Sequence, residues 1–374
     1  MKIARIDVFQ ADLPYAGGEY RLSGGRSYEC FDATFVRVVT DTGLEGWGES
    51  TPFGTDYIAA HAKGVRAGLA EICPSVIGAD PIGLDRLNDR MDEVLAGHLH
   101  AKTPIDVACW DIFGKATGRP VCDLLGGRVP GPVGLISSIH AGDPEEMAAR
   151  VAAHRAQGFT GHSIKVGAAE AEGGALLDAE RIQACLAARK PGEWYLVDAN
   201  GGLTPEHALR MLGALPEGLD FVLEAPCATW RETASVRRRT NRPILLDELA
   251  QAEEDLALII SEDLADGVGL KISKQGGLTR ARRQREIARA AGLVVSVQDT
   301  VGSEVSFAAI LHLAQSTPRR MLRCALDTRA MVAKQIAAFE APIRQGGAEA
   351  PAVPGLGLVP DLSVLGDPVA SYEG

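Results

Sequence analysis

The sequence lacks the features that mark several large protein classes. It has no uninterrupted apolar run long enough to cross a membrane. Its start, Met1–Phe9, alternates charged and apolar residues as a strand does and has no signal-peptide pattern. Its seven cysteines are scattered, odd in number and without a Cys-x-x-Cys pair. We therefore expect reduced, mostly buried thiols in a cytoplasmic protein.

Positive charge and phosphate-binding loops are also scarce. The 38 Lys and Arg residues are outnumbered by 49 Asp and Glu residues, which gives a net charge of −11. Such an acidic surface argues against nucleic acid or an anionic membrane as a partner. The segment Gly355-Leu-Gly-Leu358 lacks the third glycine and the following helix of a dinucleotide-binding loop. With these partners excluded, the sequence is still compatible with a small-molecule substrate.

The first third of the chain predicts an α+β domain over residues 1–125. A chain of 374 residues is long for one domain. Its early patterns predict three strands followed by three helices: strands at 3–13, 33–40 and 43–50, and helices at about 57–73, 82–96 and 103–117. The polar stretch between Gly17-Gly18 and Gly24-Gly25 predicts a mobile loop.

From about residue 130 the pattern changes to short apolar strands that alternate with helices rich in Ala, Arg and Glu. The expected strands are 133–139, 161–166, 194–198, 221–225, 244–248, 268–273, 293–298 and 322–326. Eight strands are the number that a closed β/α barrel needs, although the last helix is poorly marked. We assign the barrel to residues 126–345. The Gly- and Pro-rich segment 346–374 is expected to pack back on the first domain.

Three carboxylates, Asp198, Glu224 and Asp247, end three consecutive predicted strands. Their spacing is 26 residues (224 − 198) and then 23 (247 − 224), and a further 24 (271 − 247) lead to Lys271. Each step is about one strand plus one helix, so the four side chains should ring one mouth of the barrel. Converging carboxylates repel one another and need a cation. Mg²⁺ suits an all-oxygen ligand set better than zinc does.

Two lysines should flank this cation. Lys165 lies near the end of the second predicted strand, on the same face as Ser163. The two-residue period of a strand likewise places Lys271 with Ser273 and points Lys274 outward. Because the second and sixth strands of an eight-strand ring lie on opposite sides, Lys165 and Lys271 should face each other across the mouth.

Opposed lysines beside a cation suit the chemistry of an α-proton. One lysine can remove the α-proton of a carboxylate substrate, because the cation stabilises the enediolate that forms. The other lysine can deliver a proton to the opposite face or assist departure of a β-leaving group. To act as a base near neutrality, each lysine needs a depressed pKa, which mutual repulsion, the cation and partial burial should all favour.

Together these residues resemble the enolase superfamily, in its mandelate racemase and muconate lactonizing branch. The resemblance covers essentially the whole chain and rests on the triad and on three further motifs, namely Asp106-Val-Ala-Cys-Trp-Asp-Ile-Phe-Gly-Lys115, Leu124-Leu-Gly-Gly127 and Lys271-Ile-Ser-Lys-Gln-Gly-Gly277. It implies an α/β fold, a (β/α)7β-type modified TIM barrel with an N-terminal α+β capping domain. It also implies Mg²⁺ at Asp198, Glu224 and Asp247, acid/base roles for Lys165 and Lys271, and a homo-oligomer.

One residue departs from the family pattern. The usual Lys-x-Lys of the second strand is here Ser163-Ile-Lys165. The missing lysine removes a positive charge that would help to bind the substrate carboxylate and to depress the pKa of Lys165. A substrate with its own cationic nitrogen would favour that loss. Asp299 and Asp327, at the ends of the seventh and eighth strands, could then pair with the ammonium group.

Within the branch, the chain looks most like the cis-3-hydroxy-L-proline dehydratases. No histidine stands at the end of the seventh strand, where acid-sugar dehydratases place one. The segments that carry the likeness are 31–35, 50–57, 224–231 and 298–304. The resemblance implies a dehydratase that forms Δ1-pyrroline-2-carboxylate through an enediolate, with Lys165 as base and Lys271 as acid. Tyr57, Ser163 and Asn200 are further candidates for substrate contact.

Other interpretations stay open. A racemase or 2-epimerase of proline, hydroxyproline or their betaines would use the same two lysines. A catalytically silent barrel conflicts with the intact triad, and opposed lysines match metal-assisted hydrolysis poorly. Tyr57 could simply pack locally, and Asn200 could simply shape its turn. Lys274 is expected to neighbour the carboxylates, whereas His98 and His100 are expected to be solvated.

Overall fold

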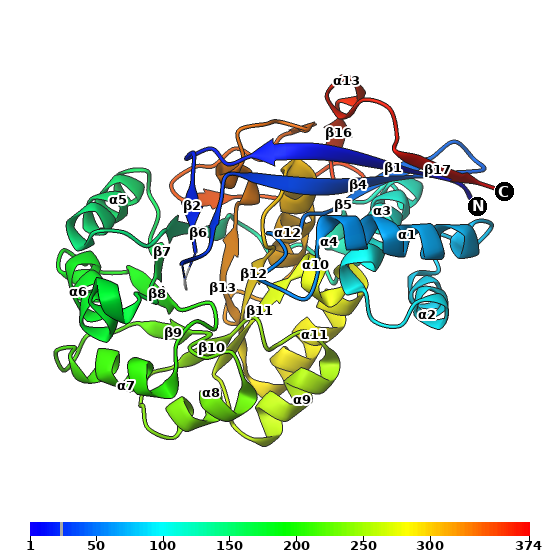
Figure 1. Ribbon diagram of the computed structural model, residues 1–374. Coiled ribbons are helices and arrows are strands. Elements are labelled where there is room, and N and C mark those ends of the chain that lie inside the picture. The colour runs from blue at the N-terminus through cyan, green and yellow to red at the C-terminus, as the bar shows by residue number, and fades with distance from the viewer. Residues whose placement is uncertain (23–24) are drawn as a thin grey trace.

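In the computed structural model, which describes residues 1–22 and 25–374, the two predicted units are a four-stranded sheet with helices and a β/α barrel (Figure 1). The predicted loop between Gly17 and Gly25 includes Gly24, which lies outside the described residues. The seven cysteines are free, and all except the exposed Cys30 are buried, as predicted.

The first sheet is antiparallel with the order β17-β1-β4-β5. Its strands are β1 (Ile3–Pro14), β4 (Cys30–Thr40), β5 (Glu45–Ser50) and β17 (Ala370–Glu373), and a small hairpin joins β2 (Tyr20–Arg21) to β3 (Ser27–Tyr28). The helices α1 (Ala62–Val76), α2 (Leu84–Val94) and α3 (Leu99–Thr117) follow. Helix α1 begins at residue 62 rather than 57, so Tyr57 lies in the loop before it.

Helix α3 packs closely against β5 because that strand carries two glycines. A Cβ atom at Gly46 would collide with the carbonyl oxygen of Ala108, and one at Gly48 would collide with that of Pro104. Both obstacles are backbone atoms, which cannot rotate away. The alternation Glu-Gly-Trp-Gly-Glu in β5 therefore sets the distance between the helix and the sheet.

The barrel contains eight parallel strands in the described part of the chain, closed by pairing of β13 with β6. They are β6 (Val133–Ile139), β7 (Gly161–Lys165), β8 (Trp194–Asp198), β9 (Val222–Glu224), β10 (Ile244–Leu246), β11 (Gly267–Lys271), β12 (Val294–Gln298) and β13 (Leu322–Leu326). Each predicted strand is present, with ends displaced by at most a few residues.

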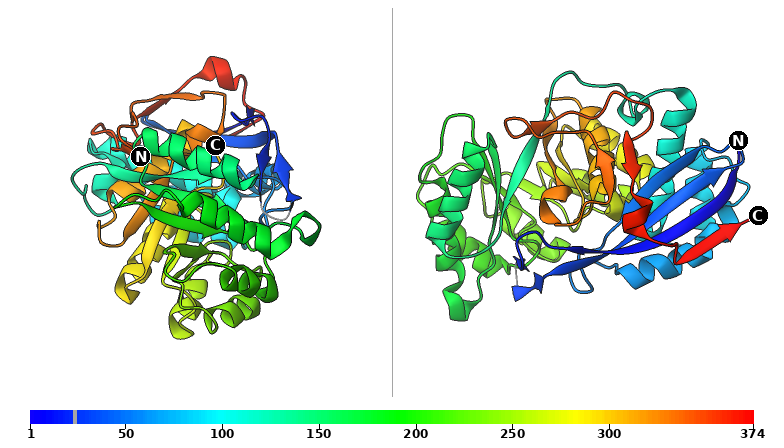
Figure 2. Two further views of the ribbon diagram at one scale, coloured as in Figure 1. Left: turned by 90° about the vertical axis from the view of Figure 1, so that its left-hand side faces the viewer. Right: turned by 90° about the horizontal axis from the view of Figure 1, so that it is seen from above.

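Helices connect the strands along the outside of the barrel (Figures 1 and 2). They are α5 (Pro144–Ala156), α6 (Gly174–Leu186), α7 (Pro205–Gly213), α8 (Trp230–Arg237), α9 (Glu253–Ser261), α11 (Leu278–Ala291) and α12 (Glu304–Gln315), with short turns α4 (Val121–Leu124) and α10 (Ile272–Gln275). Strand β13 is followed only by the 3-10 turn η3 (Thr328–Met331). The barrel is thus of the (β/α)7β type, as predicted.

The C-terminal segment touches both units. Strand β15 (Gly347–Ala348) pairs with β6 of the barrel, whereas β17 pairs with β1 of the first sheet. Between them lie β16 (Leu358–Pro360), which pairs with β14 (Ala337–Phe339), and the turn α13 (Leu362–Leu365). Strand pairing alone does not define a domain boundary. The predicted domain limits 1–125, 126–345 and 346–374 therefore stay predictions.

The motif 106–115 in α3 joins the two units rather than supplying chemistry. The buried Asp106 accepts hydrogen bonds from the backbone N–H of Thr279 (3.0 Å), its hydroxyl (2.5 Å) and Asn88 Nδ2 (2.7 Å). The buried Asp111 accepts from the N–H of Leu356 (2.8 Å) and from Lys115 Nζ (2.8 Å). Asp106 thus holds α3 on helix α11 of the barrel, and Asp111 holds it on the C-terminal segment.

Candidate active site

A cavity lies where the first unit meets the mouth of the barrel. Tyr20, Leu22, Phe53 and Tyr57 line it from the first unit; Ile136, Ser138, Ser163, Lys165, Leu196, Asp198, Asn200, Glu224, Lys271, Gln298, Asp299, Thr300, Leu326 and Met331 line it from the barrel unit. Its volume is about 40 Å³. The side chains therefore fill most of the mouth.

The three predicted carboxylates gather at this mouth. Asp198 and Glu224 are the last residues of β8 and β9 and are partners in register, and Asp247 directly follows β10. Their exposed fractions are 4%, 2% and 2%. Burial, reinforced by the charges of Asp198 and Asp247, raises the pKa of Glu224 well above its ordinary value. Positive charge is needed here to keep all three ionised.

Lysines supply that charge in this arrangement. Lys165 Nζ donates to Asp198 Oδ2, while Asp247 binds Lys271 Nζ at 2.5 Å and Lys274 Nζ at 2.8 Å. Among residues 1–22 and 25–374, no three His, Cys, Asp or Glu side chains form a ready metal-binding group. An ion would have to displace ammonium groups from Asp198 and Asp247.

Even so, the donor set fits a hard divalent cation. Glu224 Oε1 is buried and has no hydrogen-bond donor among the described residues. An unpaired carboxylate oxygen in the interior is costly, and a cation would satisfy it. The lysines already show that Asp198 and Asp247 turn their oxygens toward positive charge.

The two candidate acid/base lysines stand on opposite sides of the barrel. Lys165 ends β7 and Lys271 ends β11, and β8, β9 and β10 lie between them in the ring. Burial by itself lowers the pKa of each lysine, but carboxylates, first of all Asp198 for Lys165 and Asp247 for Lys271, outweigh it and raise both pKa values. The depressed pKa was predicted with the cation's charge included, so it stays a prediction.

Lys274 does not point outward as predicted. Strand β11 ends at Lys271, and Ile272 begins the turn α10, so the two-residue period no longer applies. Lys274 is buried, and its ammonium donates to the side chain of Asp247 and to the carbonyl of Gly269 (3.2 Å). It does neighbour the carboxylates, as the alternative interpretation held.

The two late-strand aspartates differ in position. Asp299 lines the cavity, where Ser273 Oγ (2.7 Å) and the N–H of Thr300 (2.8 Å) donate to its carboxylate. Asp327 does not line it, because Arg329 holds its carboxylate at 2.8 Å. The structure thus brings Asp299, but not Asp327, to the predicted site.

The predicted histidine pair is also divided. His98 is exposed, but His100 is buried, with Nδ1 at 3.2 Å from Ser50 Oγ. Burial, followed by the charges of Lys274 and Lys271, lowers the pKa of His100 to about 3. The prediction that His100 is solvated is wrong, because helix α3 turns its ring toward the first sheet and away from water.

Glu248 is a site residue that we did not single out from the sequence. Its Oε1 accepts hydrogen bonds from Tyr57 Oη (2.7 Å) and from Asn200 Nδ2 (3.1 Å). Tyr57 Oη in turn accepts from Lys271 Nζ (2.6 Å). The sequence feature that could have identified Glu248 is its position directly after Asp247, where a second carboxylate follows a predicted metal ligand at the end of a strand.

Comparison with known proteins places the chain in a family. Residues 146–364 match the enolase C-terminal domain-like family, and residues 28–126 match the mandelate racemase / muconate lactonizing enzyme N-terminal domain. The chain belongs to the mandelate racemase and muconate lactonizing branch of the enolase superfamily. It is therefore an enzyme of this superfamily, and the first unit is the family's capping domain.

Individual proteins of this branch differ in how similar they are to the chain. The chain is 43% identical to the cis-3-hydroxy-L-proline dehydratase of Roseibium aggregatum over 374 residues, which are 100% of both chains. It is 30% identical to the N-succinyl-L-Arg/Lys racemase of Bacillus cereus, over 84% of this chain and 85% of that one. A mandelate racemase/muconate lactonizing-type structure from Roseovarius nubinhibens ISM, complexed with magnesium, is 64% identical, with a TM-score of 0.98 and 100% of both chains covered.

Over the described residues, no helix combines the length and the apolar character that crossing a bilayer requires.

Proposed function

We propose that this enzyme is a Mg²⁺-dependent dehydratase that converts cis-3-hydroxy-L-proline to Δ1-pyrroline-2-carboxylate. The observation that carries the proposal is the 43% identity, over the full length of both chains, to the dehydratase of Roseibium aggregatum. The opposed lysines at the barrel mouth are consistent with the elimination that this reaction needs.

Asp198, Glu224 and Asp247 would hold Mg²⁺. Their oxygen donors suit this ion, and the unpartnered Glu224 Oε1 supports its presence. When bound, Mg²⁺ stabilises the negative charge that grows on the substrate carboxylate as the α-proton leaves. Its charge beside Asp198 and Asp247 also offsets the carboxylates that raise the pKa values of Lys165 and Lys271.

The stereochemistry of the substrate requires a base and an acid on opposite ring faces, and we propose Lys165 as the base and Lys271 as the acid. In cis-3-hydroxy-L-proline the hydroxyl and the carboxylate share one ring face, so the α-hydrogen lies on the opposite face from the hydroxyl. Lys165 Nζ takes the α-proton on one side. The C3–O bond breaks on the other side, where Lys271 Nζ gives a proton to the departing hydroxyl, and water leaves. The enamine then tautomerises to the cyclic imine.

Four cavity residues complete the proposed substrate site. Tyr57, Ser163, Asn200 and Asp299 all line the cavity. The uncharged Ser163 leaves the ring nitrogen free of a repelling lysine, and Asp299 supplies a carboxylate on the Lys271 side, where it binds Ser273. Asp327 does not enter this proposal, because Arg329 already pairs with it.

A direct assay tests the proposal. Purified enzyme with Mg²⁺ is incubated with proline, the hydroxyproline isomers and their betaines, and the cyclic imine is trapped with o-aminobenzaldehyde. We expect trapped product from cis-3-hydroxy-L-proline. If no imine is trapped although the enzyme is folded and Mg²⁺ is present, the proposal is contradicted.

A second candidate is a racemase or 2-epimerase of proline-type amino acids, favoured by the 30% identity to the N-succinyl-L-Arg/Lys racemase. In D₂O, such an enzyme would place deuterium at the α-carbon of recovered substrate in both configurations, without trapped imine. The homo-oligomer and the cytoplasmic location stay predictions, and light scattering of the purified protein checks the first.

A further inference from the structure

A continuous chain of hydrogen bonds joins the two lysines through Glu248. From Lys271 it runs to Tyr57 Oη (2.6 Å) and on to Glu248 Oε1 (2.7 Å). From the same Oε1 it continues to Asn200 Nδ2 (3.1 Å). Asn200 also donates from its backbone N–H to Asp198 Oδ1 (2.9 Å), and Asp198 binds Lys165. A single oxygen atom of Glu248 is therefore the point where both halves meet.

Glu248 itself stands behind the cavity. It is not among the residues that line it, whereas Tyr57 and Asn200, which it binds, both are. Tyr57 comes from the capping domain and Asn200 from the loop after β8. Asn200 has φ 46°, a left-handed conformation that asparagine tolerates better than most residues. Glu248 thus fixes two walls of the cavity that belong to separate parts of the fold.

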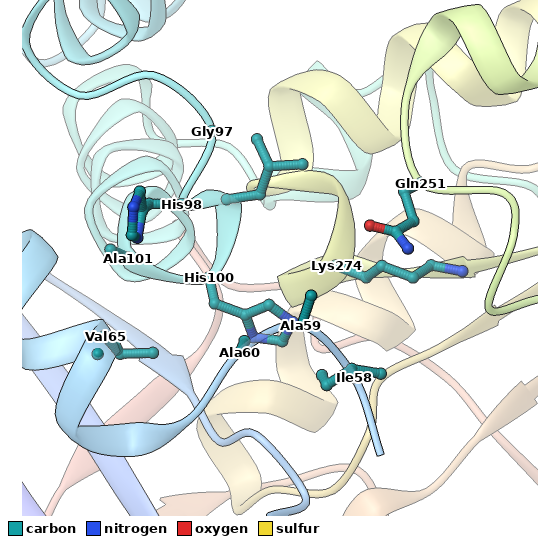
Figure 3. Close-up of a pocket in the computed structure, with 12 residues that line it drawn as sticks. Ile58, Ala59, Ala60, Val65, Gly97, His98, His100, Ala101, Gln251 and Lys274 are labelled. Atoms are coloured by element: carbon teal, nitrogen blue, oxygen red, sulfur yellow. The ribbon is translucent and has the colours of Figure 1, made fainter. Parts of the chain in front are cut away.

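The segment after Tyr57 borders a second cavity, whereas the Tyr57 ring packs on that of Phe53, with ring centroids 5.7 Å apart. Ile58, Ala59 and Ala60 form part of the wall of a second cavity, of about 250 Å³, together with His98, His100 and Gln251 (Figure 3). A segment that borders open space gains few of the contacts that hold a core residue. Its neighbour Asp56 accepts a hydrogen bond from Tyr28 (2.6 Å), but that contact stays within the capping domain.

From these contacts we propose that Glu248 is a positioning residue. Its Oε1 draws the capping loop 54–60 onto the barrel through Tyr57 and at the same time orients Asn200, so that Lys271 and the substrate meet in one geometry. The kinetic part of this role rests on the proposed dehydratase function. The structural part, a loop fastened to the barrel where Tyr57 Oη donates to Glu248 and accepts from Lys271, holds whatever the substrate is.

Paired substitutions test the role. Glu248→Ala removes the acceptor, and we expect kcat/KM to fall about 100-fold, the loss typical of a small misplacement of reacting groups. Glu248→Gln keeps a carbonyl oxygen for Tyr57 and Asn200 and should retain activity within about 10-fold of the wild type. In a Tyr57→Phe, Asn200→Ala background, Glu248→Ala should cost little more, because its partners are gone. The exposed Glu254→Gln serves as the matched control.

Two measurements that need no substrate complete the test. Hydrogen exchange of the backbone in 54–60 should speed up in Glu248→Ala but not in Glu248→Gln or the control. Mg²⁺ affinity, measured by calorimetry, should fall no more than about 100-fold in Glu248→Ala, because Glu248 reaches the proposed ligand Asp198 only through Asn200. Unchanged hydrogen exchange, additive kinetic losses or a loss of Mg²⁺ affinity well above about 100-fold would each overturn the positioning role. If the wild type fails to dehydrate hydroxyproline, only the proposed function is contradicted. Backbone hydrogen exchange in 54–60 still tests the positioning role of Glu248.

Discussion

Ser163 and Lys165 stand at alternate positions of strand β7 and line the same cavity. A lysine at position 163 would therefore bring a second ammonium into the space next to Lys165. Two like charges about 5 Å apart repel by about 3 kcal/mol in a partly buried site, and a substrate ammonium nearby would feel the same repulsion.

The first prediction follows from this neighbourhood. Ser163→Lys should raise KM for cis-3-hydroxy-L-proline and lower kcat/KM by at least roughly 10-fold, through repulsion of the ring nitrogen. Ser163→Met separates charge from size, because its side chain is similar in length and neutral. An equal loss in both variants would contradict the electrostatic explanation.

The second prediction separates the roles of the two lysines. Lys165→Ala should abolish both dehydration and exchange of the α-proton with D₂O, because the base is gone. Lys271→Ala should lose dehydration by roughly 1000-fold, the scale of a missing general acid, while α-proton exchange persists. Proton NMR of the substrate in D₂O measures both rates. The exposed Lys63→Ala is the control, and exchange lost from Lys271→Ala but kept in Lys165→Ala would reverse the assignment.

The fold and the cluster of charged residues could be predicted because they depend on periodic patterns. Eight apolar strands and regular spacing placed Asp198, Glu224 and Asp247 at one barrel mouth, and strand order placed Lys271 across from Lys165. These inferences need only the strand period and the geometry of a closed barrel.

The contacts across the domain boundary could not be predicted in the same way. Tyr57 reaches Glu248 across 191 positions of sequence, in a loop that has no periodic pattern. Lys274 turned inward because β11 ends at Lys271, so that the predicted alternation no longer applies to it. Asp327 was an open candidate from its strand end, but its carboxylate pairs with Arg329, which follows in the same turn. The orientation and the partners of these side chains depend on the residue at which a strand ends and on which charged or polar side chain lies closest to each of them.

The third prediction concerns the metal. Glu224→Gln keeps the shape of the side chain but removes its charge, so the affinity for Mn²⁺, used as a spectroscopic substitute for Mg²⁺, should fall at least roughly 100-fold. Electron paramagnetic resonance of free Mn²⁺ measures this without turnover. Chelation of the wild-type enzyme should abolish dehydration, and added Mg²⁺ should restore it. Undiminished Mn²⁺ binding in the variant would remove Glu224 from the ligand set.

The fourth prediction is the response of stability to acid. His312 Nδ1 accepts the N–H of Cys122 (3.0 Å), and Nε2 lies 3.1 Å from the carbonyl of Leu356, so the ring is held neutral between the helix α12 and two other segments. Burial lowers the pKa of His312 from 6.5 to about 4. Below pH 6.5 the unfolded chain binds this proton and the folded chain does not, so stability is lost as pH falls from 6.5 through 4.

This shift corresponds to about 3 kcal/mol lost between about pH 7 and pH 4. Urea unfolding at a series of pH values should show that loss, and His312→Gln should be less stable at neutral pH but have a shallower dependence on pH. The exposed His61→Gln provides a comparison, since its ring is already near water. An unchanged slope in His312→Gln would show that other groups cause the acid sensitivity.

The last prediction concerns the contact that holds the capping helix α3 on its sheet. Gly46→Ala would drive a Cβ atom into the carbonyl oxygen of Ala108, and because that atom belongs to the backbone, helix and strand must move apart. We expect a loss of about 3 kcal/mol in unfolding free energy, the upper range for overpacking, and a Tm lower by several degrees. Gly213→Ala is the matched control, because a Cβ atom there meets nothing within 4 Å and alanine favours the helix. If the two variants are equally stable, close packing against β5 does not set the position of α3. If Gly46→Ala is destabilised, the backbone amides of α3 should also exchange their hydrogens faster than in the wild type. The added methyl group would push α3 away from β5, where Gly46 and Gly48 otherwise allow close contact.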